Sequence, residues 1–224
     1  MFLDMIFEEN AQMETFKHVL PSDIEKNSFL IIKEELEKMQ VKIPKEEEPV
    51  VMRVIHTTAD FDYVSSLCFS KDAVSIGINA LKSGAAIVTD TNMALAGINK
   101  TALKKLGCNS YCFMADGDVA EKASSLGLTR AAVSMRKAAL LNEKIIFAIG
   151  NAPTALIEIC SLIEQGFRPE LVIGVPVGFV NVVPAKEMLM RMDVPYIVNR
   201  GRKGGSNVAA AICNALLYCG GGRQ

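Results

Sequence analysis

From residue 85 onward the chain alternates short apolar runs with longer stretches of helical periodicity, and this alternation limits the possible fold more than any other feature. The apolar runs lie at 85–89, 110–114, 145–149, 171–175 and 195–198. Helical stretches follow them at about 92–105, 118–126 with 129–141, 153–165, 182–191 and 205–217. Such alternation is typical of βαβ units, whose right-handed crossovers place strands side by side in a parallel sheet. The sequence therefore predicts an α/β fold, a three-layer α/β/α sandwich around a five-stranded, mainly parallel, doubly wound sheet.

The first 83 residues lack these runs, and their periodicity predicts helices instead. Residues 22–40 carry apolar side chains at helical spacing, and Ser22 with Glu25 three residues later has the form of a capping box. Residues 49–58 and 72–82 also show helical spacing, the first of them behind an acidic run that suits a helix start. Helices are therefore expected to precede the sheet.

The length of 224 residues fits one domain with a substantial core. We expect this domain to span 1–219, with a helical part over 1–83, the doubly wound part over 84–219 and a flexible tail over 220–224. The acidic N-terminus is unlike a secretory signal, and the longest apolar run, 171–183, is broken by glycine and proline and too short to cross a bilayer. With a net charge of only −1, we expect a cytoplasmic protein without a membrane or nucleic-acid partner.

The cysteines favour a reducing environment and no metal. Six of them stand at positions 68, 108, 112, 160, 213 and 219 and include no Cys-x-x-Cys pair. With only two histidines, His18 and His56, the chain has too few ligands for a convincing zinc site. We expect the cysteines to be reduced and mostly buried. A redox role for Cys108 and Cys112 is the alternative, although the alternating residues 109–114 favour a strand there.

In doubly wound sheets ligands bind beyond the carboxyl ends of the strands, so the strand positions indicate where a site would lie. The segments at those ends are 90–93, 115–118, 150–154, 176–179 and 199–206. They concentrate the small, polar and cationic residues of the second half, whereas the helices between them are rich in alanine, leucine, methionine and lysine. The unusual chemistry of the chain is therefore expected along one edge of the sheet.

The segment RGRKGGS at 200–206, called the cationic turn below, is the strongest of these candidates. Three cations within four residues precede glycines that open a helix, whose free N–H groups and dipole favour an anion. The spacing is not the Gly-x4-Gly-Lys-Ser/Thr of a phosphate loop, and no Gly-x-Gly-x-x-Gly follows the first strand. Nucleotide binding is therefore disfavoured, and a basic loop that is only solvated is the alternative to an anion site.

His56 lies beside the apolar stripe of the predicted helix 49–58, not at its centre, and hydroxyls and two carboxylates follow it. It is therefore a boundary residue, either structural or catalytic. His18 stands in a polar segment and is expected to be a solvated surface residue. Arg130 and Arg136 lie in a predicted helix of small residues, where one of them could be an anion clamp and a surface position is the alternative.

Four motifs occur in order along the chain, RVIHTTADF at 53–61, GNAPTAL at 150–156, GVPVGFV at 174–180 and RGRKGGS at 200–206, with VTDT at 88–91 between the first two. Together they resemble the precorrin-8X methylmutase family, the precorrin isomerases of cobalamin biosynthesis, which include the cobalt-precorrin-8 enzymes. The resemblance covers roughly residues 20–218. Four ordered motifs over nearly the whole chain are specific, whereas a single one would not be.

The resemblance implies an isomerase that moves a methyl group from C-11 to C-12 of the corrinoid macrocycle in a [1,5]-sigmatropic shift, giving hydrogenobyrinate or cobyrinate. It also implies a homodimer, no cofactor, and His56 as the catalytic acid that protonates the ring C nitrogen. Cationic strand ends suit the many carboxylates of such a substrate. The expected substrate-binding residues are Thr57, Thr89, Asp90, Thr91, Arg130, Asn151, Thr154, Val177, Gly178, Lys186, Arg200, Arg202, Lys203, Gly204, Gly205 and Ser206.

One departure and two alternatives accompany the resemblance. Where many relatives have Glu-Ser-Lys, this chain has Pro184, Ala185 and Lys186, so only Lys186 keeps an expected ligand role. A non-catalytic corrinoid-binding or carrier protein of the same fold would bind product without converting substrate. A nucleotide-dependent transferase is disfavoured by the missing phosphate loop. The sequence leaves open whether the substrate contains cobalt, because the macrocycle and not the chain would ligate it.

Overall fold

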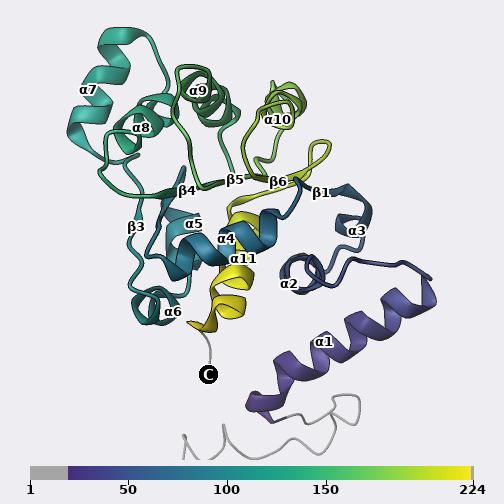
Figure 1. The fold of residues 1–224 in the computed structure, drawn as a ribbon. Helices are drawn as coiled ribbons and strands as arrows, with labels where there is room; N and C mark the ends of the chain where they lie inside the picture. Colours follow the sequence, from purple (N-terminus) through teal and green to yellow (C-terminus); the bar gives the residue numbers. More distant parts are fainter. Residues whose placement is uncertain (1–19, 223–224) are drawn as a thin grey trace, which may run out of the picture.

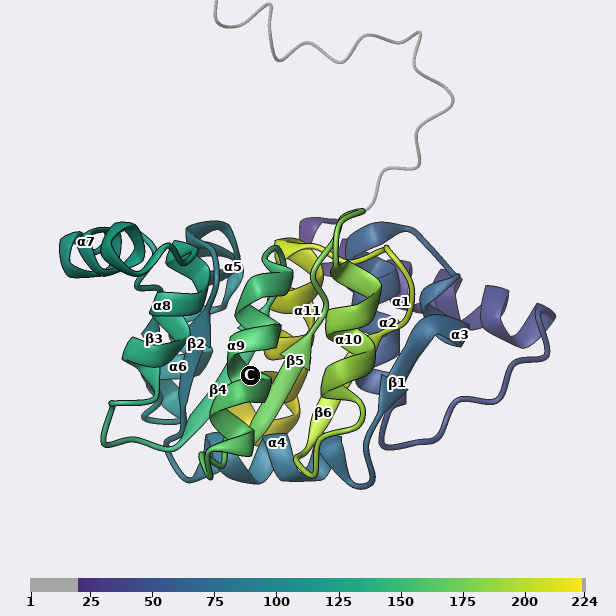
Figure 2. The ribbon, with the colours of Figure 1, turned by 90° about the horizontal axis from the view of Figure 1, so that it is seen from above.

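The computed structural model describes residues 20–222, which form one six-stranded sheet with helices on both faces (Figure 1). The strands are β1 (Leu67–Phe69), β2 (Ala86–Thr89), β3 (Ser110–Tyr111), β4 (Ile145–Ile149), β5 (Leu171–Gly174) and β6 (Tyr196–Asn199). Their order is β1-β6-β5-β4-β2-β3, which Figure 2 shows from above. β1 runs antiparallel to β6, and all other neighbours are parallel. The predicted α/β class is therefore confirmed.

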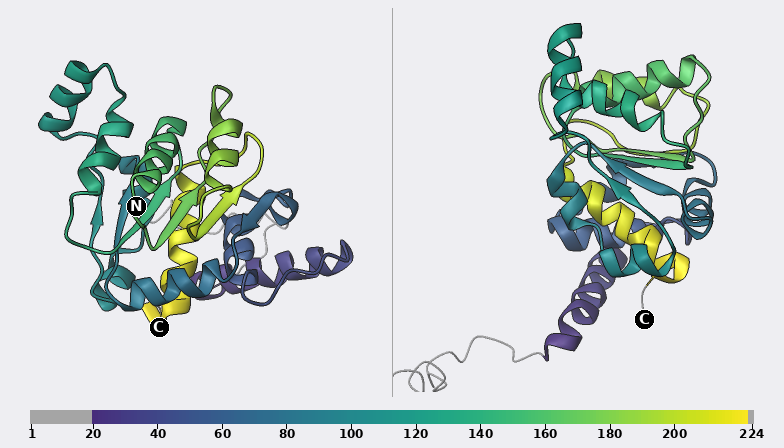
Figure 3. Two further views of the ribbon diagram at one scale, coloured as in Figure 1. Left: turned by 45° about the horizontal axis from the view of Figure 1, so that its top comes forward. Right: turned by 90° about the vertical axis from the view of Figure 1, so that its left-hand side faces the viewer.

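The helices form two layers around the sheet. One face carries α7 (Gly117–Leu126), α8 (Arg130–Ala138), α9 (Pro153–Glu164) and α10 (Val182–Leu189). The other carries α2 (Glu48–Thr58), α4 (Ala73–Lys82), α5 (Asn92–Gly97), α6 (Lys100–Lys105) and α11 (Ser206–Leu217). The short α3 (Tyr63–Ser66) precedes β1, and the π-helical turn η2 (Tyr218–Gly222) follows α11. Figure 3 shows α1 (Pro21–Lys38) extending away from the sheet, where it packs against α2.

The middle strands are buried on both faces, and their side chains alternate between two cores. In β4, Ile146 and Ala148 pack into the core formed with α2, α4 and α11, whereas Ile145, Phe147 and Ile149 pack into the core formed with α8, α9 and α10. Strands covered on both faces read as continuous apolar runs, which is why the runs are visible in the sequence.

The strand count differs by one from the five expected, and the differences lie at the edges of the sheet. β1 has only three residues, of which Leu67 alone is buried, so its apolar run is too short to indicate a strand. β3, at the opposite edge, has two residues where the sequence predicts five. An edge strand has one neighbour and one partly open side, so its pattern is weaker than that of a central strand.

The predicted helix over 92–105 is wrong, because two helices, α5 and α6, occupy this segment. Asn99 accounts for the break. Its side chain accepts a hydrogen bond from the Ala102 N–H at 2.9 Å and caps α6. Its own N–H donates to Asn214 Oδ1 of α11 at 2.8 Å, which draws the chain out of helical geometry.

The predicted capping box at the start of α1 is also wrong. The helix begins at Pro21 with Leu20 as the cap residue, and no side-chain hydrogen bond caps it. The side chain of Glu25 instead accepts a hydrogen bond from Arg53 of α2 at 2.9 Å. Glu25 therefore forms a tertiary ion pair with Arg53 and not the helix cap that the local pattern predicts.

The two ends of the chain fall partly outside the description. Residues 1–19, with His18, and residues 223–224 lie outside the described part, whereas 220–222 of the expected tail belong to η2. Among the described residues, no helix is both long and apolar enough to cross a membrane.

Candidate active site at the carboxyl edge of the sheet

The site lies where the winding of the sheet reverses. From β2 the chain crosses to β3 at one side, and β4, β5 and β6 then follow on the other side of β2. In such sheets ligands bind outside the carboxyl ends of the strands, at this reversal. Asp90 directly follows β2, and the segment 150–152 directly follows β4, so both stand at the reversal point.

Asp90 holds the two loops of the reversal point together. Its side chain is fully buried, and its carboxylate accepts hydrogen bonds from the N–H groups of Gly150 (2.8 Å), Asn151 (2.8 Å) and Ala152 (2.6 Å). Burial raises the pKa of Asp90, and these three donors oppose that shift because they stabilise the charged form. The structure thus turns this expected ligand residue inward, toward the backbone that leads into α9.

The cationic turn touches the same loops through glycines. A Cβ on Gly150 would lie 2.6 Å from the Cα of Ser206, so the backbones of the β4 loop and the cationic turn are in contact. A Cβ on Gly204 would lie 2.1 Å from the carbonyl oxygen of Val175, and Gly204 has a φ of +153°. The Gly205 N–H donates to the same oxygen at 2.9 Å. Glycine at these positions therefore allows backbone approach that a side chain would prevent.

Two expected threonine ligands bind groups of the chain itself. Thr91 caps α5 by accepting from the Ala94 N–H at 3.0 Å, and its hydroxyl lies 2.7 Å from Ser206 Oγ at the start of α11. Thr89 is fully buried, and its hydroxyl donates to the carbonyl oxygens of Thr91 (3.0 Å) and Tyr111 (3.3 Å). The contact between Thr91 and Ser206 thus joins the loop after β2 to the cationic turn.

Lys186 bonds to the backbone of the cationic turn from the α10 side. This lysine of α10 is 1% exposed, and its ammonium donates to Asn199 Oδ1 (3.2 Å) and to the carbonyl oxygens of Gly201 (2.9 Å) and Lys203 (2.7 Å). Burial lowers the pKa of Lys186 to about 8. Its three acceptors all come from this chain, so the geometry suits a supporting role. Ala185, at the departure from the family pattern, is buried in the core.

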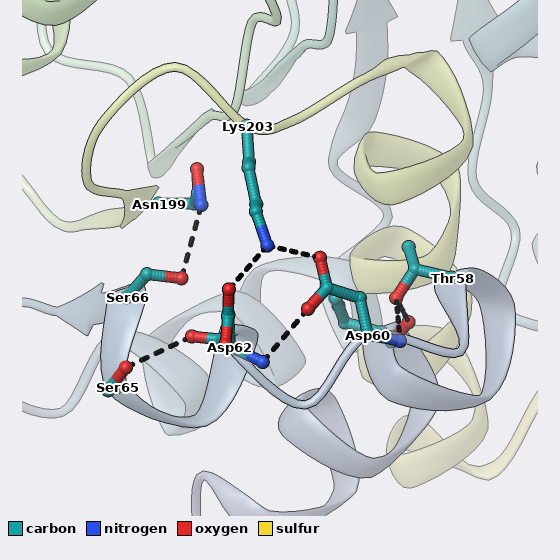
Figure 4. A network of polar contacts seen from close by, with 8 residues as sticks. Thr58, Asp60, Asp62, Ser65, Ser66, Asn199 and Lys203 are labelled. Atoms are coloured by element: carbon teal, nitrogen blue, oxygen red, sulfur yellow. Dashed lines mark hydrogen bonds and ion pairs between the residues drawn. The ribbon is translucent and has the colours of Figure 1, made fainter.

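The side chain of Lys203 reaches across to the segment after α2 (Figure 4). Its ammonium lies 2.6 Å from a carboxylate oxygen of Asp60 and 2.6 Å from one of Asp62. The hydrogen bond from Lys203 lowers the pKa of Asp60, and the two carboxylates raise the pKa of Lys203. The sequence marks two carboxylates after His56, but it gives no sign that they pair with a residue more than 140 positions away.

Arg200, Arg202 and Lys203 are all exposed, but only Lys203 is paired with Asp60 and Asp62 among the ion pairs of residues 20–222. The Arg202 guanidinium stands 5.6 Å from the ring centroid of Phe179, and its carbonyl oxygen accepts from the Gly178 N–H at 3.2 Å. Phe179 is 85% exposed and Val180 is 77% exposed. The edge therefore offers cations beside large exposed apolar side chains, a combination that suits a broad, partly apolar anion.

His56 stands in the last turn of α2, which ends at Thr58. It is half-buried, whereas Val54 and Ile55 beside it are in the core, so the predicted boundary position is confirmed. Its imidazole stacks on the Phe29 ring of α1, with centroids 5.1 Å apart and planes 22° apart. Sequence reasoning missed Phe29 as the neighbour of His56, because an apolar stripe shows which face is buried but not what lies against it.

Of the remaining expected residues, Arg130, Asn151 and Thr154 lie on the α8 and α9 side of the edge, whereas Thr57 lies in α2 and Val177 in the loop after β5. Arg130 and Asn151 are exposed, and Thr154 Oγ1 accepts from Thr129 Oγ1 at 2.9 Å. Arg136 is not an anion clamp, because it donates to both carboxylate oxygens of Glu158 at 2.7 and 3.1 Å. Thr57 is exposed next to His56, and Val177 is exposed at the start of the Phe179 loop.

The surroundings of Cys108 bear on the redox alternative. All six are free, and burial raises the pKa of Cys108, whose thiol contacts the Leu81 carbonyl oxygen at 3.1 Å. A raised pKa leaves less thiolate, which disfavours the redox alternative for this residue. Within residues 20–222, no group of three or more histidine, cysteine, aspartate or glutamate side chains could hold a metal ion.

The strand order defines a doubly wound α/β protein, and the reversal point, the glycine-rich cationic turn and the histidine-bearing end of α2 form its candidate ligand site. The family model described as precorrin-8X methylmutase matches residues 23–219. Cobalt-precorrin-8 methylmutase from Leptospira interrogans is 48% identical over 208 residues, with 88% of this chain and 93% of that protein covered. The Priestia megaterium cobalt-precorrin-8 methylmutase is 47% identical over 199 residues, with 88% of each chain covered.

A solved structure agrees with these relatives. The precorrin-8X methylmutase from Thermus thermophilus is similar with a TM-score of 0.81 and 39% identity, over 89% of this chain and 98% of that one. The chain therefore belongs to the precorrin-8X methylmutase family, and it is an isomerase.

Proposed function

We propose that this enzyme of cobalamin biosynthesis moves a methyl group from C-11 to C-12 of precorrin-8X or cobalt-precorrin-8, with His56 as the general acid. One bond from carbon to methyl breaks and another forms within the same molecule, so substrate and product are isomers. His56 donates a proton to the ring C nitrogen, and the proton returns to His56 once the shift is complete. No redox step or external nucleophile takes part.

The observation that carries this proposal is the family match over residues 23–219 combined with the make-up of the carboxyl edge. Arg200 and Arg202 are exposed there, and the Arg202 guanidinium stands over the exposed Phe179 ring, so carboxylates and the apolar face of a macrocycle can be held together. Product formation changes the conjugation of the macrocycle. The test is therefore absorption spectroscopy of purified protein with the metal-free and with the cobalt substrate. A change with either supports the isomerase, whereas binding without a change supports a carrier protein.

His56 supports the acid role through its placement. Its ring is half-buried and stacked on Phe29, which limits its rotation, and it lies two residues before the end of α2. Histidine is the side chain whose ordinary pKa lies nearest neutral pH, so it can give and recover a proton within one turnover. A restrained ring costs little to orient when the substrate binds.

The cationic turn is proposed to bind the carboxylates of the macrocycle through Arg200, Arg202 and the amides at the start of α11. Replacing both arginines with Gln should raise KM and weaken product affinity, because each charge-assisted contact contributes about 1.5–3 kcal/mol. Such contacts exist in both the ground and transition states, so kcat should change little. Isothermal titration with product, repeated at increasing salt concentration, measures the effect.

The matched control removes the same two charges at the opposite edge of the sheet. Lys104 and Lys105 are exposed in the last turn of α6, and replacing both with Gln should leave product affinity within about two-fold. An unchanged dissociation constant in the double arginine variant would make the turn a solvated loop and move the anion site elsewhere.

A homodimer in the cytoplasm is proposed for the assembly. Ile24 and Ile31, two turns apart on α1, are 54% and 59% exposed, and such apolar surface on a helix suits burial against another protein surface. Two-fold dimers are the commonest assembly of soluble enzymes. Sedimentation at micromolar concentration should give about twice the 24.3 kDa of one chain. An active monomer at that concentration would contradict this expectation.

A further inference from the structure

Lys203 is held at both ends, which is unusual for a residue expected to bind a ligand. Its carbonyl oxygen accepts a hydrogen bond from the buried Lys186 ammonium at 2.7 Å, so a side chain of α10 holds the backbone of the cationic turn. Its own ammonium donates to Asp60 and Asp62 at 2.6 Å each (Figure 4). One residue thus joins α10, the cationic turn and the segment after α2.

The contacts of Asp60 continue into the last turn of the helix that carries His56. The Asp60 N–H donates to Thr58 Oγ1 at 3.3 Å, and the Thr58 hydroxyl donates to the Val54 carbonyl oxygen at 2.8 Å. Between them, Ala59 ends α2 in the left-handed conformation, with a φ of 53°. The path from Lys203 to the end of α2 is therefore a chain of short polar contacts.

A second set of bonds runs beside this path. The Arg200 N–H donates to the Ser66 carbonyl oxygen at 2.7 Å, and Asn199 Nδ2 donates to Ser66 Oγ at 3.3 Å. The Asp62 N–H donates to Asp60 Oδ1 at 2.9 Å. The segment from 58 to 66 is thus fastened to the segment from 199 to 203, although more than 130 residues separate them.

The charges argue against Lys203 as a carboxylate ligand. Two carboxylates against one ammonium leave a net negative group, and a third carboxylate brought there would be repelled by the other two. Arg200 and Arg202 have no such neighbours among the ion pairs of residues 20–222. The arginines are therefore the better candidates for binding carboxylates, and the contacts of Lys203 suit a structural role.

We propose that Lys203, with Asp60 and Asp62, is a positioning bridge that sets the distance between the carboxylate-binding turn and His56. A macrocycle held by its carboxylates on the turn then presents ring C at a fixed place relative to the imidazole. This inference rests on the proposed function of His56 and the turn. A misplacement of about 1 Å is enough to cost about 10²-fold in rate, whereas an exposed ion pair adds little to folding stability.

Three variants test the bridge through a split between kcat and affinity. Lys203→Met, the double variant Asp60→Asn with Asp62→Asn, and all three changes together should each lower kcat by about ten-fold and leave product Kd within about two-fold. The triple variant should be no slower than Lys203→Met, because all three changes break one interaction. Lys203→Arg keeps the charge and the reach, and should restore most of kcat.

A Lys203 that bound the substrate would behave differently. Lys203→Met would then weaken product affinity about ten-fold or more, and the two Asn changes would tighten it with kcat unchanged. That pattern would overturn the bridge.

A second readout needs no turnover. The chain has two histidines, so two pairs of imidazole C–H signals are expected in its NMR spectrum. The pair that disappears in His18→Gln belongs to His18, and the other belongs to His56. The His56 signal should move in Lys203→Met and in the double Asn variant, and stay in place when Arg200 and Arg202 are changed to Gln. An unmoved His56 signal in Lys203→Met would overturn the bridge. Absence of turnover in the wild type would instead refute the proposed function, and the NMR result would still decide on the bridge.

Discussion

Replacing His56 with Ala is expected to lower kcat by about 10²-fold or more, the usual contribution of a positioned proton donor, while product affinity stays nearly the same. In the proposed mechanism the proton acts on the ring nitrogen as the methyl group moves, whereas the cationic turn holds the carboxylates. The stack on Phe29 and the core position of Ile55 place the ring without depending on its charge. Single-turnover kinetics with product titration separates the two effects.

The control for this variant is the other histidine. His18→Ala should leave kcat within about two-fold, since the sequence predicts a solvated surface residue at position 18 and such substitutions have small effects. Phe29→Leu should lower kcat less than His56→Ala, because it loosens the imidazole without removing it. Near-full turnover in His56→Ala would remove the histidine from the mechanism, whatever the effect of the other two changes.

Replacing Asp90 with Ala should cause the largest loss of stability. The change removes the shared acceptor of three N–H groups, at Gly150, Asn151 and Ala152, in a place with no exposed surface at residue 90. Bonds to a charged acceptor contribute about 1.5–3 kcal/mol each, and neighbouring bonds are not additive, so a loss of about 3–5 kcal/mol is expected. For a chain of this size that lowers Tm by about 10 °C, which differential scanning calorimetry measures.

Two further variants sharpen this prediction. Asp90→Asn keeps one oxygen of the same shape and should lose less stability than Asp90→Ala. Asp118→Ala removes an exposed carboxylate paired with Lys137, and should shift Tm by no more than about 2 °C. If Asp90→Ala unfolded within about 2 °C of the wild type, the carboxylate would not be what joins the loops after β2 and β4.

The sequence predicts the layers of this fold better than its edges. Runs such as 145–149 are readable because both faces of a central strand are buried, so apolar residues are required at every position. β1 has three residues and one buried side chain, and no local pattern distinguishes it from a loop. The break between α5 and α6 depends on Asn214, which lies more than 100 residues further along the chain.

For the site, the sequence locates the edge but not the direction of each side chain. Asp90 and Lys203 lie at strand ends, as the motifs predict, and Lys186 lies in α10 next to the cationic turn, yet each bonds to groups of the chain itself. A residue type at a strand end shows which chemistry is available there. Whether the side chain faces a ligand or supports a loop depends on partners brought close only by the folded backbone, as Asp60 is to Lys203.

The central claim is that this enzyme moves a methyl group with the help of His56, and carbon NMR of a labelled substrate tests it most directly. With ¹³C in the methyl group on C-11, catalytic wild-type protein should replace that methyl signal with the signal of a methyl group on C-12. The His56→Ala variant should leave the original signal in place over the same period. A labelled macrocycle that binds to the wild type but keeps its C-11 methyl signal would contradict the claim, and so would conversion by His56→Ala at the wild-type rate.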